Sequence, residues 1–383
     1  MLSGRTRHIV NVLCITCLLL DSGGGLGLRN VAFLIIFGYA FWSVYRNALI
    51  NKAFIMLYGI FIISILPAIY VSINNAIPIG DMMIWVVAFL LIPFLYLYAK
   101  ESRLDSRAFV TGGVIFSVII LLLFFGRLFD VTVAVDVNNF ISDRSNGFFH
   151  NKEYVSGDVL PNVYFQGTLG LVICGTVCLE QRKNWSFVLI LIALILAPSR
   201  FGFLVLCAWA AFLFLRRSPA RVLYLPFVVP ILFIILNSLA FGTELLGAFT
   251  GQGDDSGIRS GHLKSIYEIL SNDISGLFFG QGPGSIFFSK GFNYYTDNIE
   301  MSQVEYIRKY GILSFAAFNL FYFWPIFSKK PNTFTLKGAL VVYYLVSFSN
   351  PVLFSIFAML FLTFAYIKIS EMDAPDLQNS LSS

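Results

Sequence analysis

The sequence predicts an all-α integral membrane protein with about twelve transmembrane helices. Composition is the first reason: 57% of the 383 residues are hydrophobic and 12% are charged, whereas a soluble domain carries about 25% charged residues. Apolar runs long enough to cross a bilayer are the second reason, and the distribution of Lys and Arg between their connections is the third. The formal net charge of +5 is mild, so no nucleic-acid partner is expected.

The apolar runs follow one another through the whole chain. A run of about 17 to 25 residues spans the hydrocarbon core, and we place such runs at 7–22, 29–45, 53–73, 79–99, 108–127, 162–180, 184–198, 200–216, 222–241, 303–327, 334–349 and 351–369. The first run follows Arg5 and Arg7 like a secretory signal. It lacks a small-x-small cleavage site, so we interpret it as an uncleaved first helix.

The positive charges orient the predicted spans. Most Lys and Arg on short segments fall on one side of the membrane, namely Arg5, Arg7, Arg46, Lys52, Lys100, Arg103, Arg107, Arg182, Lys183, Arg216, Arg217, Arg221, Lys329, Lys330, Lys337 and Lys368. By the positive-inside rule this side is cytoplasmic, and both termini lie there. The turns at 197–200 and 347–351 are very short, so the two spans on either side of one of them could instead be a single kinked helix. In that case every later loop would lie on the other side of the membrane.

Residues 1–383 form one polytopic domain with two long periplasmic loops, at 127–161 and 241–302. The first combines alternating apolar residues with turn formers. The second contains Leu263, Ile266, Tyr267 and Leu270 at helical spacing. We therefore expect it to be partly helical, from about Ser260 to the Ser271–Asp273 turn.

Metal and thiol chemistry have no sequence support. All the cysteines lie inside apolar runs, where they are ordinary helix-face residues: Cys14, Cys17, Cys174, Cys178 and Cys207. The motifs HExxH and GxSxG are absent. We expect no metal and no cofactor.

Three residues near the outer surface are candidates for chemistry. Arg200 opens a predicted span, where the helix dipole opposes a cation, and an ionisable residue at membrane depth is a functional candidate. Arg259 and His262 share one edge of the predicted loop helix. The alternatives are an arginine that reaches lipid phosphates and a solvated surface helix.

Glycines and carboxylates mark the end of the second loop. Gly282 and Gly284 belong to the turn Gly280–Ser285, which either brings backbone close to a ligand or reverses the chain. Asp297 and Glu300 fit a capping box for the next span. Glu305 lies inside that span, where Arg308 and Lys309 fall at pairing distance, i+3 and i+4.

Mid-span positions hold almost no ionisable residues. Proton-coupled pumps need such residues as relays inside the membrane. The charged tracts lie in the external loops, and this favours a chemical function at the outer surface over transport across the membrane.

Three stretches resemble the O-antigen polymerase family of bacterial inner membranes, which is related to the O-antigen ligases. They are Ala197-Pro198-Ser199-Arg200; Ser256-Gly257-Ile258-Arg259 followed by LKSIYEIL and LFFGQGPGS; and Asp297-Asn298 leading through Glu305 to Lys309-Tyr310-Gly311. Ligases usually have His before Asn where this chain has Asp297, so the resemblance favours a polymerase over a ligase.

The resemblance implies a metal-independent glycosyltransferase that joins undecaprenyl-pyrophosphate-linked oligosaccharide repeat units at the periplasmic face of the inner membrane. It also implies a chain-length regulator as partner, besides membrane lipid. Arg200 and Arg259 are then expected to stabilise the pyrophosphate leaving group. His262, Asp297 or Glu305 is expected to be the base.

Tyr294 and Tyr295 are expected to stack on sugars, or alternatively to belong to an interfacial aromatic belt. An O-antigen ligase, which transfers polymer to lipid A core, and a flippase or transporter remain the alternative functions.

Overall fold

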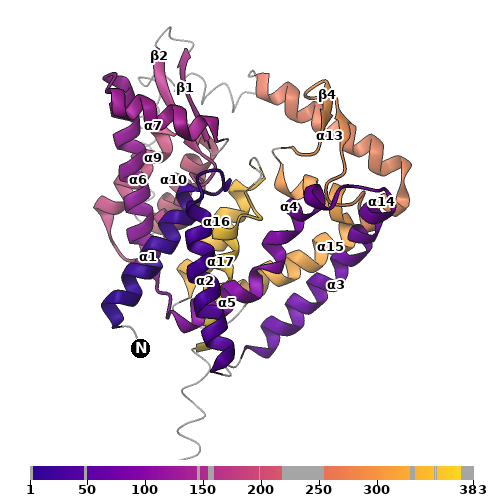
Figure 1. The fold of residues 1–383 in the computed structure, drawn as a ribbon, viewed down its shortest axis with the longest axis horizontal. Coiled ribbons are helices and arrows are strands. Elements are labelled where there is room, and N and C mark those ends of the chain that lie inside the picture. The colour runs from indigo at the N-terminus through magenta and orange to yellow at the C-terminus, as the bar shows by residue number, and fades with distance from the viewer. Residues whose placement is uncertain are drawn as a thin grey trace, which may run out of the picture.

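The computed structural model describes residues 3–46, 50–144, 147–153, 159–197, 199–217, 254–299, 301–327, 333–348, 350 and 352–371. This part of the chain is mainly helical, with two short β-hairpins (Figure 1). In chain order its elements are α1 (Gly4–Leu20), α2 (Leu28–Tyr45), α3 (Lys52–Asn74), α4 (Ile79–Leu90), α5 (Ile92–Glu101), α6 (Ser106–Leu128), α7 (Thr132–Asp143), β1 (Gly147–Glu153), β2 (Val159–Phe165), α8 (Gly170–Glu180), α9 (Asn184–Leu196), α10 (Arg200–Arg217), α13 (Asp254–Asn272), α14 (Ile274–Phe279), β3 (Phe287–Ser289), β4 (Tyr294–Thr296), α15 (Ser302–Phe327), α16 (Phe334–Val346) and α17 (Ile356–Glu371).

The chain is a multi-pass helical membrane protein. Within the described residues, 5 helices are long and apolar enough to cross a membrane: Leu28–Tyr45, Lys52–Asn74, Ile79–Glu101, Ser106–Leu128 and Ser302–Phe327. Shorter apolar helices accompany them at Gly170–Glu180, Asn184–Leu196, Phe201–Arg216, Phe334–Val346 and Ile356–Ile369. Large apolar side chains such as Leu34, Ile63 and Tyr70 are exposed on these helices, as lipid-facing positions are.

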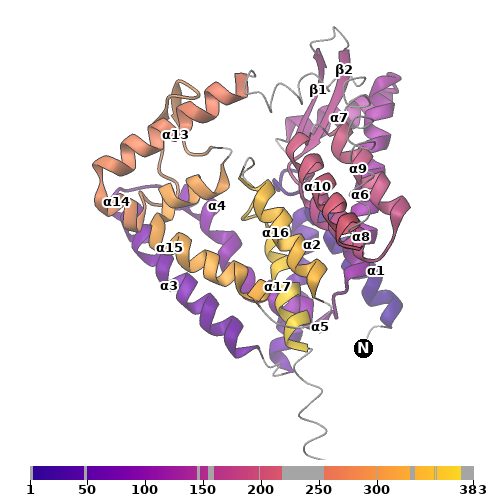
Figure 2. The ribbon, with the colours of Figure 1, turned by 180° about the vertical axis from the view of Figure 1, so that it is seen from behind.

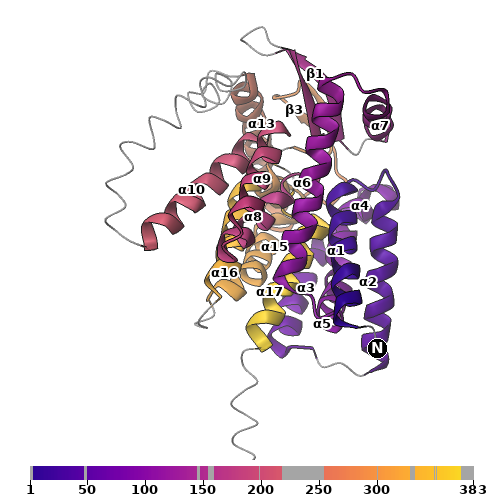
Figure 3. The same ribbon diagram turned by 90° about the vertical axis from the view of Figure 1, so that its left-hand side faces the viewer.

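The two long loops gather at one end of the molecule. There α7 and the β1–β2 hairpin lie at the same end as α13 and the β3–β4 hairpin, whereas α1 begins and α17 ends at the opposite end (Figures 1 and 2). A view from the side shows the same separation (Figure 3). Both ends of the described chain therefore lie on the face opposite the loops.

Aromatic side chains join helices that are distant in sequence. Phe54 of α3 contacts Phe321 of α15 and Tyr366 of α17, with ring centroids 5.8 and 5.3 Å apart. Phe109 of α6 contacts Phe361 of α17 at 5.2 Å. Helix α17 thus packs between the α3/α15 side and the α6 side and continues one buried core.

The predicted sixth span, 162–180, is wrong in its first half. Residues up to Phe165 form β2, which pairs antiparallel with β1, and helix α8 begins only at Gly170. Pro161 disfavours a helix interior, and the branched and aromatic residues Val163 and Phe165 suit a strand. Both are buried, and Phe165 packs on Phe116 of α6.

The other predicted spans correspond to helices with shifted ends. The run at 79–99 is divided at Leu91, between α4 and α5, just before Pro93. Separate helices flank both short turns, because α9 ends at Leu196 before α10, and α16 ends at Val346 before α17. The predicted span 222–241 lies outside the described residues.

The loops contain more regular structure than the sequence indicated. The first holds helix α7 and the β1–β2 hairpin, and the second holds β3 and β4, which pair antiparallel with Phe288 opposite Tyr295. The chain is mainly helical as predicted, but it is not all-α, because both loops contain a strand pair beside their helices and β2 extends into the predicted sixth span. Helix α13 ends at Asn272 as expected but begins at Asp254 rather than near Ser260.

Candidate functional site

Helix α15 is broken at Gly311, where φ is 80° and ψ is 167°. A break leaves the last carbonyls of the preceding turn without helical partners. The carbonyls of Arg308 and Lys309 instead accept hydrogen bonds from the backbone N–H groups of Gln281 and Gly282, at 2.8 and 3.0 Å. The second long loop is thus bonded to the broken end of this span.

The glycine-rich turn Gly280–Ser285 fits between three helices. Gly280, Gly282 and Gly284 all have positive φ, at 81°, 95° and 82°, which glycine adopts without steric cost. Ser72 at the end of α3 donates to the Pro283 carbonyl at 2.9 Å, and a side chain at Gly284 would meet α4 at Met82. The close approach that the sequence indicated is therefore made to the protein's own helices.

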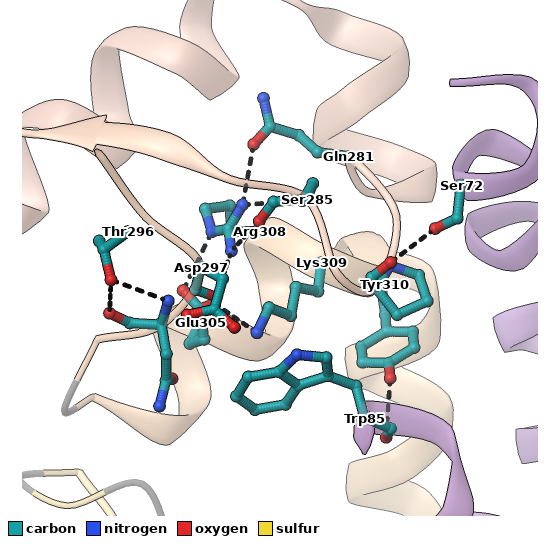
Figure 4. A network of polar contacts seen from close by, with 12 residues as sticks. Ser72, Trp85, Gln281, Ser285, Thr296, Asp297, Glu305, Arg308, Lys309 and Tyr310 are labelled. Carbon is teal, nitrogen blue, oxygen red and sulfur yellow. Dashed lines mark hydrogen bonds and ion pairs between the residues drawn. The ribbon is translucent and has the colours of Figure 1, made fainter. Parts of the chain in front are cut away.

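Arg308 ties this turn to the span (Figure 4). Its buried guanidinium donates to both oxygens of Glu305, from Nε to Oε2 at 3.0 Å and from Nη2 to Oε1 at 2.6 Å. The guanidinium also donates to the glycine-rich turn, at Gln281 Oε1 (3.3 Å), Ser285 Oγ (2.9 Å) and the Ser285 carbonyl (3.1 Å). A further hydrogen bond, of 3.1 Å, goes to the Asp297 carbonyl. One side chain closes both ends of the segment 281–297.

Lys309 adds a second cation to the same carboxylate. Its Nζ lies 2.9 Å from Glu305 Oε1 and over the ring of Trp85 in α4. The pairing of Glu305 with Arg308 and Lys309 is confirmed. Since both of its oxygens are engaged by cations, Glu305 serves here as the counter-ion of a buried cluster.

Asp297 is placed differently from the expected capping box. Helix α15 begins at Ser302, whose hydroxyl donates to the Asn350 carbonyl at 2.6 Å, so Asp297 is not its N-cap. The intervening Ile299 and Met301 are buried under α13 in a small apolar cluster with Ile266 and Phe287. Asp297 itself is exposed. Glu300, the other residue of the predicted capping box, lies outside the described residues.

His262 lies on the buried face of α13. Its Nδ1 and the Ser289 hydroxyl of β3 are hydrogen-bonded at 2.6 Å, and its ring meets Phe292 edge-on at 4.3 Å. Ser289 Oγ also accepts the Phe292 N–H at 3.1 Å. His262 therefore fastens the β3–β4 hairpin to α13.

The hairpin carries aromatic side chains on both faces. Tyr294 stacks on Phe292 with centroids 5.1 Å apart and 6° between the ring planes, and Tyr295 meets Phe288 edge-on at 5.5 Å. Tyr294 and Tyr295 remain 54% and 71% exposed. They are available to a ligand because so much of each ring stays uncovered.

The structure brings together some of the expected residues. Glu305 and the backbone carbonyl of Asp297 meet at Arg308, and Gly282 donates to the carbonyl of the neighbouring Lys309. His262 and Tyr294 meet at Phe292. Strand β3 joins the two groups, because Phe287 lies against the Arg308 guanidinium, 4.5 Å from ring centroid to Cζ, and Ser289 bonds His262. Arg259 is half-buried on α13.

Other residues fall outside these groups or were missed by the sequence. Arg200 is the first residue of α10, and its side chain lies outside the described part of the chain. The sequence missed Trp85, Gln281 and Ser285 as partners of the cluster. In the sequence, partners of Glu305 and Arg308 could be recognised only by helical spacing within the same span. Trp85, Gln281 and Ser285 belong to other segments.

No family model matches the sequence, and no curated protein matches it. Within the described residues, no group of three or more His, Cys, Asp and Glu side chains could hold a metal ion.

Proposed function

We propose that this protein polymerises undecaprenyl-pyrophosphate-linked oligosaccharide repeat units into O-antigen polysaccharide, at the periplasmic face of a bacterial inner membrane. Its termini are then cytoplasmic, and its partners are the lipid-linked sugar, membrane lipid and a chain-length regulator. The proposal rests on the resemblance of three sequence stretches and on the layout of the second long loop.

One observation carries the proposal: the loop with the candidate residues is fastened to a broken membrane span. The glycine-rich turn lies against α3 and α4, and Phe287 of the aromatic hairpin lies against Arg308 of α15. A substrate with its lipid tail in the bilayer presents its pyrophosphate and sugars at this level. A fixed surface there holds two sugar chains in register at a lower entropic cost than a free loop.

The proposed reaction is a glycosyl transfer. A sugar hydroxyl of one unit attacks the anomeric carbon of another, a C–O bond forms, and the anomeric C–O bond to pyrophosphate breaks. The bonding electrons leave with the lipid pyrophosphate, and the hydroxyl proton passes to a base. Charge grows on the leaving group, where fixed cations stabilise it. We assign this role to Arg200 and Arg259, since Arg308 and Lys309 are occupied by Glu305.

Geometry ranks the three candidate bases. Glu305 is engaged by two cations, and His262 is 1% exposed and bonded to Ser289. The Asp297 carboxylate is exposed, while its own backbone carbonyl is fixed by Arg308. A base must reach the proton that it removes, so we propose Asp297 as the base. Tyr294 and Tyr295 supply faces on which sugar rings stack.

The lipopolysaccharide banding pattern of a strain that lacks the protein tests the function. Core carrying a single repeat unit is the expected pattern, and a wild-type copy restores the ladder. Asp297→Asn is expected to give the single-unit pattern at normal protein level. Asp273→Asn, an equal charge change in the same loop, is expected to keep the ladder.

Two outcomes would overturn the proposal. Complete polymer that stays on undecaprenyl pyrophosphate would indicate a ligase. Repeat units that accumulate on the cytoplasmic leaflet, with none on the core, would indicate a flippase.

A further inference from the structure

An open surface cavity of about 540 Å³ lies at the end of the molecule opposite the two long loops, lined by Ser106, Arg107, Gln181 and Lys183, of which Arg107 and Lys183 are exposed. Ser106 and Arg107 begin α6, and the other two residues form the turn between α8 and α9. Its volume is in the range of small-molecule sites, about 300 to 1,000 Å³. The proposed glycosyl transfer does not use this cavity.

The cavity has two cations and no acid to balance them. Neither Arg107 nor Lys183 has an ion-pair partner among the described residues. The neighbouring acids are engaged elsewhere: Asp105 accepts the Ala108 N–H at 2.9 Å and lies 3.6 Å from His8 Nδ1, and Glu180 hydrogen-bonds Thr335 of α16. Like charges that share a cavity repel each other, and an anion between them relieves this repulsion.

Polar groups of the cavity are already arranged around it. Gln181 Nε2 donates to Ser106 Oγ at 2.9 Å. This bond fixes the α8–α9 turn on α6 and leaves the Ser106 hydroxyl proton free to be donated. A guanidinium, an ammonium and a hydroxyl together suit the oxygens of a phosphate.

The position of the cavity indicates the source of the phosphate. Membrane helix α6 and apolar helix α9 both begin beside it, and Trp185 in the first turn of α9 is 88% exposed. Exposed Trp is typical of the membrane interface, and basic pockets between membrane helices bind anionic headgroups.

We propose that this cavity binds the phosphate headgroup of an anionic phospholipid. Arg107 and Lys183 hold the phosphate, Ser106 donates to it, and the Gln181 amide meets hydroxyls of the headgroup. The bound lipid thereby links α6 to the α8–α9 turn on the termini side.

Thermal unfolding of the purified full chain in nanodiscs tests this site. Replacing part of the phosphatidylcholine with phosphatidylglycerol is expected to raise the wild-type midpoint. Arg107→Gln/Lys183→Gln is expected to lose this rise while keeping the wild-type midpoint in pure phosphatidylcholine, which shows that it folds. In native mass spectrometry its apparent affinity for phosphatidylglycerol should fall at least about tenfold.

Arg5→Gln/Lys52→Gln is the matched control, because both of these cations are exposed at the same end and do not line the cavity. It should keep the full lipid effect. An equal loss in both double variants would mean general surface attraction and would overturn the site. Equal protection of the wild type by inorganic phosphate in phosphatidylcholine would also overturn it, because the site would then not require a lipid.

Discussion

Arg308 is the residue on which the second long loop depends most. Its guanidinium is fully buried and bonds the span through Glu305 and the loop through Ser285 and Asp297. A buried cation with every donor directed to an acceptor is a positioning element. The position of Asp297, our proposed base, therefore depends on the Arg308 side chain, which bonds its backbone carbonyl.

We expect Arg308→Gln to destabilise the protein strongly. Removing one partner of a buried ion pair costs about 3 to 5 kcal/mol, and loop acceptors lose their donor as well. The variant should lower the thermal midpoint and make residues 281–297 sensitive to limited proteolysis. Arg308→Lys keeps the charge but loses the bidentate contact with Glu305. Its thermal midpoint should therefore lie between those of the wild type and Arg308→Gln.

Lys290→Gln is the control for Arg308→Gln, since Lys290 pairs with Glu268 on the exposed side of the same loop. An exposed pair contributes up to about 1 kcal/mol. Equal losses of stability in Lys290→Gln and Arg308→Gln would contradict the role of the buried cluster.

Asp273 provides a pH-dependent cap for α14. Its Oδ1 accepts the Gly276 N–H at 2.9 Å and the Ser275 hydroxyl at 2.7 Å, and these bonds to the charged form lower its pKa. Because the folded pKa is below the unfolded one, the cap stabilises the fold above the unfolded pKa. This stability is lost as the pH falls through the folded pKa.

Asp273→Asn keeps a capping side chain but does not titrate. As the pH is lowered from about 6 to about 3, the thermal midpoint of the wild type should therefore fall more than that of Asp273→Asn. The change should be small because the carboxyl is mostly exposed. A difference that stays constant over this range would refute the cap's dependence on charge.

Helices and strands could be predicted from the sequence where a single local pattern determines them. Apolar length placed the long spans, and helical spacing paired Glu305 with Arg308 and Lys309. By contrast, β2 forms because β1 lies beside it and α6 covers it, and neither partner is visible in residues 162–165. The break in α15 escaped prediction because a lone Gly311 inside an apolar run is tolerated in many helices.

Gly311→Ala should disrupt the junction of α14 and α15. The conformation at Gly311 belongs essentially to glycine and costs other residues about 1 to 3 kcal/mol, and a new Cβ would collide with the Phe278 carbonyl. The thermal midpoint should fall, and the lipopolysaccharide ladder should contain less long polymer. Gly38→Ala, in the exposed middle of α2, meets no atom within 4 Å and should leave both unchanged. A tolerated Gly311→Ala would show that the break is not required.

At the scale of the whole molecule, the sequence predicted the separation of loops and termini through its charge pattern. Charge pattern and helix length are both local properties of a segment, so a single sequence carries them. The contacts of α17 with α3, α6 and α15 are not local, because they join aromatic residues that belong to different helices far apart in the sequence.

Cysteine labelling tests this arrangement across the membrane. Val133 of α7 and Tyr295 of β4 are 71% exposed and lie in the two loops, whereas the exposed Ser3 precedes α1 at the other end. A membrane-impermeant maleimide added to cells with a permeabilised outer membrane should label Val133→Cys and Tyr295→Cys. It should label Ser3→Cys only after lysis. The native cysteines contribute little background because four are buried and Cys207 is half-buried. Labelling of Val133→Cys and Tyr295→Cys from opposite sides would mean that the two loops do not share a face, and the arrangement of loops and termini across the membrane would then be wrong.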